Sequence, residues 1–161
     1  RIVGRMLPRA WFALVLLACG GAPPPTTPTP TVVPVEQPPV SAAAAQAALT
    51  EQYDVGKALY VSKKCASCHG DHGEGNPKNP PVIGAAALPA KAPVGAKLRA
   101  SVTFATAKDV LAFVRAKMPL KEPNTLTDEE AAAVTSWMLS ESKIDFAVKL
   151  DATTAGSIKL R

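Results

Sequence analysis

The chain has 161 residues, of which only 5% are aromatic, and it carries a formal net charge of +5. Three of its basic residues, Arg1, Arg5 and Arg9, precede an apolar run, and beyond residue 18 the balance is 15 basic against 13 acidic residues. A nearly balanced remainder without a basic cluster excludes the charge pattern typical of nucleic-acid-binding proteins, so we expect no nucleic acid as a partner.

Residues 1–18 have the pattern of a secretory signal peptide. The arginines are followed by about nine apolar residues, which is too short a run to span a bilayer. The run ends in Leu16-Leu17-Ala18-Cys19, which resembles the lipobox of bacterial lipoproteins, where the cysteine is lipid-modified and becomes the first residue of the mature chain. We therefore expect lipid attachment at Cys19. The alternative is ordinary signal cleavage near Ala18 with an incidental cysteine.

Residues 19–44 are expected to form a tether rich in proline, threonine and alanine. Eight prolines fall within residues 22–40, and each removes an amide donor and fixes φ, which favours extended polyproline II. At ~3.1 Å per residue this stretch spans roughly 60 Å. The alternative, a disordered tether without polyproline II structure, would span a similar distance.

A folded domain is expected over residues 45–145. A first helix is predicted to start near Thr50, because the apolar residues Val55, Leu59 and Tyr60 follow at helical spacing. Residues 70–105 are rich in glycine, proline and alanine and indicate loops.

Two more helices follow the loops. One is predicted over residues 106–117, and another from Thr127 to about Ser140, opened by a capping box with Glu130 at its third position. No long stretch alternates with a period of two, so the fold class predicted is all-α. The end of the chain, residues 146–161, fits either a small hairpin or a frayed tail.

The most specific motif is the pentapeptide from Cys65 to His69, CASCH. A Cys-x-x-Cys-His sequence is the attachment signature of a c-type haem. On one helical turn both thiols share a face and can reach one edge of a porphyrin, while the imidazole of His69 projects toward the iron. A zinc half-site, a redox Cys-x-x-Cys and a disulfide are the alternatives. No cysteine follows Cys68 to complete a zinc site, and no βαβ pattern surrounds the motif.

Together with other motifs in the same order, this pentapeptide resembles the class I (mitochondrial-type) bacterial cytochromes c. The resemblance covers about residues 50–142 and implies three main helices around one covalent haem c, with the first and last helices crossing. The motifs that carry it are Gly56-x-x-x-Tyr60, CASCHG, Gly73-x-Gly75, Pro80-Pro81-Val82-Ile83-Gly84, Met118-Pro119 and LTDEEAAAVTSWML.

The resemblance also implies roles for single residues. Gly56 would be the small residue at the helix crossing, with Tyr60 and Trp137 packed beside it; a generic core role is the alternative for both aromatics. The carbonyl of Pro80, or of its neighbour Pro81, would accept a hydrogen bond from His69 and so fix the imidazole.

The sixth iron ligand is predicted to be Met118. It lies 49 residues beyond His69, before a proline, and matches the Met-Pro position of the family. Among the other candidates, Met6 lies in the signal segment, His72 is tethered too close to His69, and Met138 fits the apolar face of the last helix. Core packing of Met118 and an open iron remain alternatives.

With both axial positions filled, the iron is suited to electron transfer and not to substrate binding. We therefore expect a one-electron carrier that exchanges electrons with redox partner proteins and has no small-molecule substrate or catalytic residue. The expected location is the periplasmic side of the bacterial cell envelope, through an N-terminal lipid anchor. A haem-based sensor or enzyme with an open sixth position, and a cytochrome subunit fixed in a larger oxidoreductase complex, are the alternatives.

Overall fold

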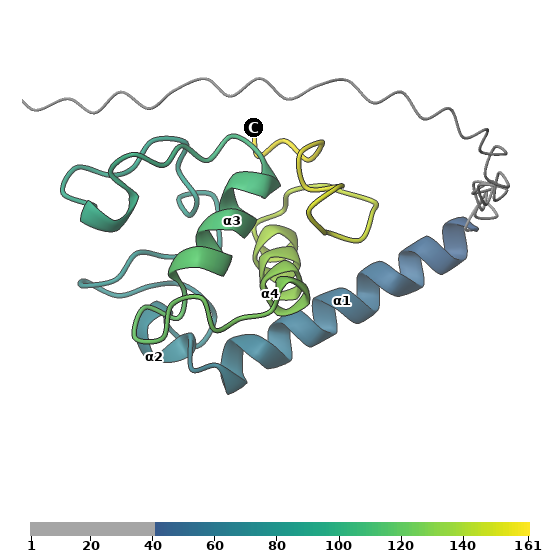
Figure 1. Cartoon of the computed structure of the whole chain (residues 1–161), viewed down its shortest axis with the longest axis horizontal. Helices are drawn as coiled ribbons and strands as arrows, with labels where there is room; N and C mark the ends of the chain where they lie inside the picture. The colour runs from purple at the N-terminus through teal and green to yellow at the C-terminus, as the bar shows by residue number, and fades with distance from the viewer. Residues whose placement is uncertain (1–40) are drawn as a thin grey trace, which may run out of the picture. The chain divides into compact units, whose positions relative to one another are not determined.

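The computed structural model describes residues 41–161, and this part of the chain is all-α, as predicted (Figure 1). It has no strand and only two isolated β-bridges, and none of its helices combines the length and apolar character needed to cross a bilayer. The signal segment, Cys19 and most of the tether lie outside the described residues. The helices are α1 (Ala42–Ser62), α2 (Ala66–His69), a 3₁₀ turn (Lys97–Arg99), α3 (Ala107–Lys117) and α4 (Asp128–Glu141).

Helix α1 starts earlier than the sequence pattern predicted. Ser41 is its N-cap, and the Ser41 hydroxyl accepts a hydrogen bond from the Ala44 amide at 3.2 Å. The prediction of a start near Thr50 was wrong, because Thr50 lies inside the helix and its hydroxyl donates to the Gln46 carbonyl at 3.0 Å. Alanine has the highest intrinsic helix propensity, so the alanine-rich stretch after Ser41 continues the helix toward the N-terminus.

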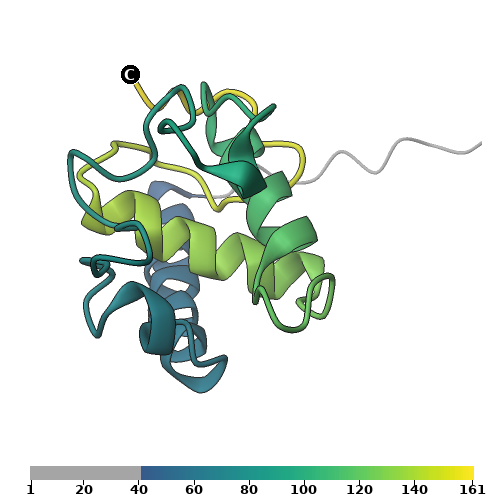
Figure 2. The ribbon, with the colours of Figure 1, turned by 90° about the vertical axis from the view of Figure 1, so that its left-hand side faces the viewer.

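Helices α3 and α4 begin where the sequence predicted, and for α4 the prediction came from its capping box. Thr106 and Asp109 form a capping box at the start of α3, and Thr127 and Glu130 form another at the start of α4. All nine residues from Ala131 to Leu139 are buried, so α4 is the central helix of the core. It contacts both α1 and α3 (Figure 2).

The contact between α1 and α4 depends on the absence of a side chain at Gly56. A Cβ atom there would lie 2.0 Å from the Ala133 carbonyl oxygen, which only a shift of the two helices could relieve. One turn further along, the rings of Tyr60 and Trp137 pack with their centroids 4.4 Å apart. The expected roles of these three residues at the crossing are therefore confirmed in the structure.

Residues 146–161 form neither of the two structures expected from the sequence, a small hairpin or a frayed tail. They form successive turns that pack against the helices and bury Leu150, Ala155 and Ile158. The side-chain amide of the buried Gln52 in α1 donates to the Leu150 carbonyl at 2.7 Å and accepts from the Leu150 amide at 2.8 Å. This pair of hydrogen bonds joins residues 98 positions apart.

The same segment caps the start of α3. The amides of Ala107 and Lys108 have no partner inside their own helix, and they donate to the carbonyls of Ile158 at 2.9 Å and Ala155 at 3.1 Å. The sequence pattern gave no sign of this, because backbone carbonyls of any residue type can cap a helix in this way. The C-terminal segment is thus part of the folded domain.

We predict that Gly56→Ala destabilises the domain by about 1–3 kcal/mol, because the added methyl group overpacks the crossing of α1 and α4. The measurement is the free energy of unfolding of the haem-loaded protein from denaturant titration. Gly156→Ala is the matched control, since no heavy atom lies within 4 Å of a Cβ at Gly156. Equal stability of the two variants would contradict the proposed close approach.

Candidate functional site

The predicted attachment motif forms the short helix α2 directly after α1. The Cys65 amide donates to the Tyr60 carbonyl at 3.0 Å, and the His69 amide donates to the Cys65 carbonyl at 2.9 Å. One helical turn separates Cys65 from Cys68, so both side chains belong to one face, as the sequence predicted. Both thiols are free and half-buried. The end of α1 therefore fixes where the Cys-x-x-Cys-His motif lies.

The surroundings of the two thiols do not form a zinc site. Over residues 41–161, no group of three or more histidine, cysteine or acidic side chains is arranged to hold a metal ion. Burial raises the pKa of the Cys65 thiol. A structural zinc site would gather further ligands around the two cysteines.

The imidazole of His69 is held by the backbone of Pro80. Its Nδ1 lies 2.9 Å from the Pro80 carbonyl oxygen, and because a carbonyl can only accept, Nδ1 is the donor. The proton on Nδ1 leaves the lone pair on Nε2 available to a metal. Of the two prolines considered from the sequence, the structure thus places the Pro80 carbonyl, and not that of Pro81, at the ring.

Glycines allow the segment that contains Pro80 to approach the motif closely. Gly75 has φ +76°, and a Cβ there would lie 2.5 Å from the Pro81 nitrogen. The Gly75 amide donates to the His69 carbonyl at 2.6 Å, and the Val82 amide donates to the Gly73 carbonyl at 2.8 Å. These hydrogen bonds fix the loop against the motif, so that the Pro80 carbonyl lies at the imidazole of His69.

Two polar contacts at the site were not inferred from the sequence. The Tyr60 hydroxyl donates to the Gly70 carbonyl at 2.6 Å, directly after His69, and burial raises the pKa of Tyr60 to about 12. The Asn76 side chain donates to the Cys68 carbonyl at 2.6 Å. The sequence pattern indicates only a packing role for Tyr60, but a buried tyrosine hydroxyl usually needs a hydrogen-bond partner, and that rule points to its polar contact.

The candidate sixth ligands occupy different environments. Met118 is the C-cap of α3, where its amide donates to the Val114 carbonyl at 3.0 Å and its side chain is half-buried against the core. Met138 is only 5% exposed within α4, as expected for core packing. His72 is exposed, and its amide donates to the Glu74 carboxylate at 2.8 Å. Cys65, Cys68, His69 and Pro80 thus lie together, while Met118 comes from a separate element.

The residues present fit a covalent haem. The donor set consists of two free thiols on one helical turn and an imidazole with a fixed tautomer, which are groups that hold haem of the c type. The core also leaves a set of apolar side chains only partly buried. They include Leu59, Cys65, Ala66, Val82, Ile83, Val102, Phe113 and Met118.

A comparison with protein families points in the same direction. A family model described as Cytochrome c matches residues 53–142, which is more than half of the chain. Among solved structures, a chain of the sulfane dehydrogenase SoxCD from Paracoccus pantotrophus matches with 23% sequence identity and a TM-score of 0.48. The match covers 66% of this chain and 52% of that chain, so the aligned part spans about half the length of that protein. A search of curated proteins gave no match.

Proposed function

Because the chain belongs to the cytochrome c family, in which haem c is attached covalently, we propose that it is a monohaem one-electron carrier. The observation that carries the proposal is the hydrogen bond of 2.9 Å between His69 Nδ1 and the Pro80 carbonyl, beside the two free thiols of Cys65 and Cys68. When bound, haem c supplies an iron that alternates between its ferrous and ferric states, one electron at a time.

In this proposal each residue of the site has a defined part. Cys65 and Cys68 form thioether bonds that keep the cofactor on the face of α2. His69 ligates the iron through Nε2, and the Pro80 carbonyl fixes the ring plane and raises the basicity of the imidazole. The Tyr60 hydroxyl supports the Gly70 carbonyl next to His69, which steadies the turn. A rigid turn of this kind keeps the ligand in place in both oxidation states.

Met118 completes the ligand set in the proposal. A thioether is a neutral, soft ligand that stabilises ferrous iron and raises the reduction potential relative to a second imidazole. Met118 is only partly buried at the end of α3, whereas Met138 is buried within the core. With His69 and Met118 both bound, no position is open to a substrate, and this is why we propose a carrier and not an enzyme.

We also propose that the protein acts on the periplasmic side of a bacterial envelope, held to a membrane by lipid on Cys19. The support is the basic and apolar start, the lipobox-like sequence and the proline-rich stretch that follows. Thioether attachment of haem takes place after export, which agrees with a signal segment at the start. Its partners are redox proteins of the same compartment.

The covalent attachment is tested on the purified protein. Acid–acetone extraction is expected to leave the colour with the polypeptide, and the pyridine haemochrome is expected to be of the c type. Cys65→Ala or Cys68→Ala should lower the yield of coloured protein or leave a single thioether. Haem that is fully extracted from the wild-type protein would refute the proposal.

The two methionines are expected to respond differently. Met118→Ala removes a neutral sulfur ligand, so the reduction potential should fall and the weak iron–sulfur charge-transfer band at the red end of the oxidised spectrum should vanish. Met138→Ala should keep that band and cost about 2–5 kcal/mol of stability, since it leaves a cavity in the core. Optical redox titration and denaturant unfolding measure the two effects.

The result for Met118 also separates a carrier from a haem enzyme or sensor. Retention of the band and the potential in Met118→Ala would place the sixth ligand elsewhere. Tight carbon monoxide binding by the reduced wild-type protein would show an open position and favour the enzyme or sensor.

The anchor is tested by Cys19→Ser. We expect the wild-type protein to fractionate with membranes, because two or more acyl chains anchor stably whereas one binds only marginally. The variant should appear as soluble, haem-loaded protein or as an unprocessed precursor. Wild-type protein found mainly in the soluble periplasmic fraction would contradict the anchor and leave the haem assignment untouched.

A further inference from the structure

The side chain of Asn76 uses both ends of its amide, and the two ends reach different parts of the site. Its Nδ2 donates to the Cys68 carbonyl at 2.6 Å. Its Oδ1 accepts from the backbone amides of Lys78 at 2.9 Å and Asn79 at 3.0 Å. One exposed side chain thus connects helix α2 to the residues that come directly before Pro80.

The contact with Cys68 completes the end of α2. The last carbonyls of a helix have no partner inside that helix, and in a longer helix the His72 amide would bond to the Cys68 carbonyl. Here the His72 amide donates to the Glu74 carboxylate instead. Within residues 41–161, the hydrogen bond that reaches the Cys68 carbonyl is the one from Asn76. The asparagine therefore supplies a bond that the short helix cannot make for itself.

On its other side, Asn76 is the first residue of a tight turn that ends at Asn79. The Asn76 amide donates to the Asn79 carbonyl at 2.9 Å, and the Asn79 amide donates to the Asn76 carbonyl at 3.1 Å. Asparagine is favoured at the first position of such a turn, and proline, here Pro77, at the second. Pro80 follows the turn directly, so the orientation of the turn determines where the Pro80 carbonyl lies.

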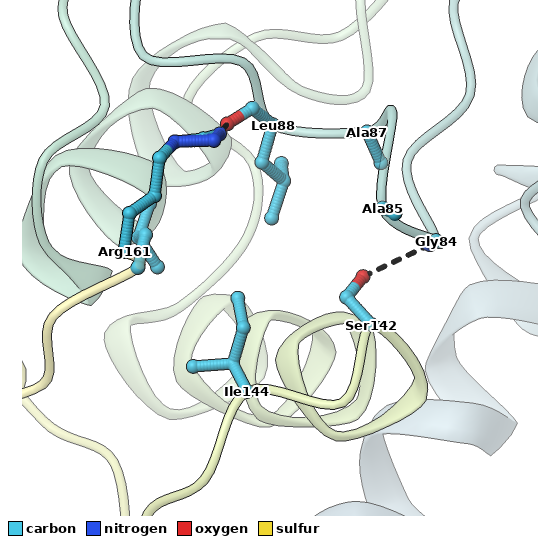
Figure 3. Close-up of a pocket in the computed structure, with 8 residues that line it drawn as sticks. Gly84, Ala85, Ala87, Leu88, Ser142, Ile144 and Arg161 are labelled. Carbon is cyan, nitrogen blue, oxygen red and sulfur yellow. Dashed lines mark hydrogen bonds between the residues drawn. The ribbon is translucent and has the colours of Figure 1, made fainter.

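Beyond Pro80 the loop is held by a different side chain. The Ser142 hydroxyl, at the C-terminal end of α4, accepts a hydrogen bond from the Gly84 amide at 3.1 Å (Figure 3). This bond joins the loop to α4 and involves neither Asn76 nor α2. The side chain that joins the loop to the attachment motif is that of Asn76, so its loss should affect mainly the part of the loop next to His69.

We propose that Asn76 is a positioning residue for His69. By joining α2 to the turn before Pro80, it keeps the Pro80 carbonyl at hydrogen-bond distance from His69 Nδ1 and so helps to set the reduction potential of the bound haem. The proposal rests on the proposed function, since it needs an iron ligated by His69. A hydrogen bond from Nδ1 raises the basicity of the imidazole, and a more basic ligand stabilises ferric iron.

A purely structural role for Asn76 predicts the opposite change in potential. A loosened loop would admit water to the cofactor, and because water stabilises the more highly charged ferric form, the potential would fall. A weaker hydrogen bond between His69 and Pro80 would instead make the imidazole a poorer donor, and the potential would rise. The sign of the shift therefore separates the two roles.

The test compares Asn76→Ala, Asn76→Ser and Asn79→Ala in the full, haem-loaded chain. Serine keeps an oxygen that can accept from the turn amides but has no donor in place of Nδ2, and it carries the test if Asn76→Ala gives too little coloured protein. Asn79→Ala is the matched control. It removes an asparagine side chain that reaches Asn76 Oδ1 only at 3.3 Å, and it leaves both backbone hydrogen bonds of the turn in place.

Both Asn76 variants are expected to have a higher potential than the wild type in optical redox titration. In proton NMR of the reduced protein, the His69 Nδ1 proton should exchange with solvent deuterium roughly fivefold faster, the factor for one hydrogen bond of typical net strength. The iron–sulfur charge-transfer band of the oxidised protein should remain, since Met118 comes from a separate element. Asn79→Ala should keep the wild-type potential and exchange rate.

A fall in potential in both Asn76 variants, or an unchanged exchange rate of the His69 Nδ1 proton, would overturn the positioning role and leave Asn76 a structural one. An equal rise in potential in Asn79→Ala would assign the effect to the turn as a whole and overturn the link through Cys68.

The pyridine haemochrome is recorded first for every variant, so that the two levels of inference fail separately. Absence of covalent haem in the wild-type protein overturns the carrier proposal and this one with it. Covalent haem together with the wild-type potential and exchange rate in the Asn76 variants overturns the role of Asn76 alone.

Discussion

The close approach of α1 and α4 at Gly56 is the constraint on which the site depends. With no side chain at Gly56, the backbone of Ala133 comes into contact and the rings of Tyr60 and Trp137 pack beside it. This fixes the direction in which α1 ends, and α2 follows within a few residues. The contact at Gly56, more than one helical turn earlier in the chain, thus sets the position of the two cysteines, because the rigid helix α1 connects the two places.

A second constraint acts from the other side of the motif. Gly75 permits a backbone approach that any side chain would block, and this brings the Pro80 carbonyl to the His69 ring. The tyrosine hydroxyl at Gly70 and the asparagine amide at Cys68 then satisfy carbonyls of the same turn. In each of these three hydrogen bonds a side chain donates to a backbone carbonyl. The fixed backbone acceptors hold the three side chains in place, which suits a site that keeps one ligand arrangement.

The sequence predicted those features that local rules determine. The start of α4 follows from its capping box, and the extent of α3 and the all-α class follow from helical periodicity. The start of α1 was missed because Thr50 also has the residue type of an N-cap, whereas the alanines before it extend the helix to Ser41. The contacts of Gln52 and Arg161 were missed for another reason. Each joins a side chain to a backbone carbonyl, 98 and 73 positions away respectively, and neither spacing nor composition encodes such a pairing.

The pairing of Gln52 with Leu150 has a consequence for the order in which the domain can assemble. The two residues are 98 positions apart, so the hydrogen bonds form only after nearly the whole domain has been synthesised. Contacts of such long range raise the contact order and slow folding, because the entropy of closing the loop is lost before the contact forms. The cysteines lie only 13 and 16 residues beyond Gln52, so they are synthesised long before Leu150. The attachment motif is thus complete well before the contact that joins α1 to the C-terminal segment can form.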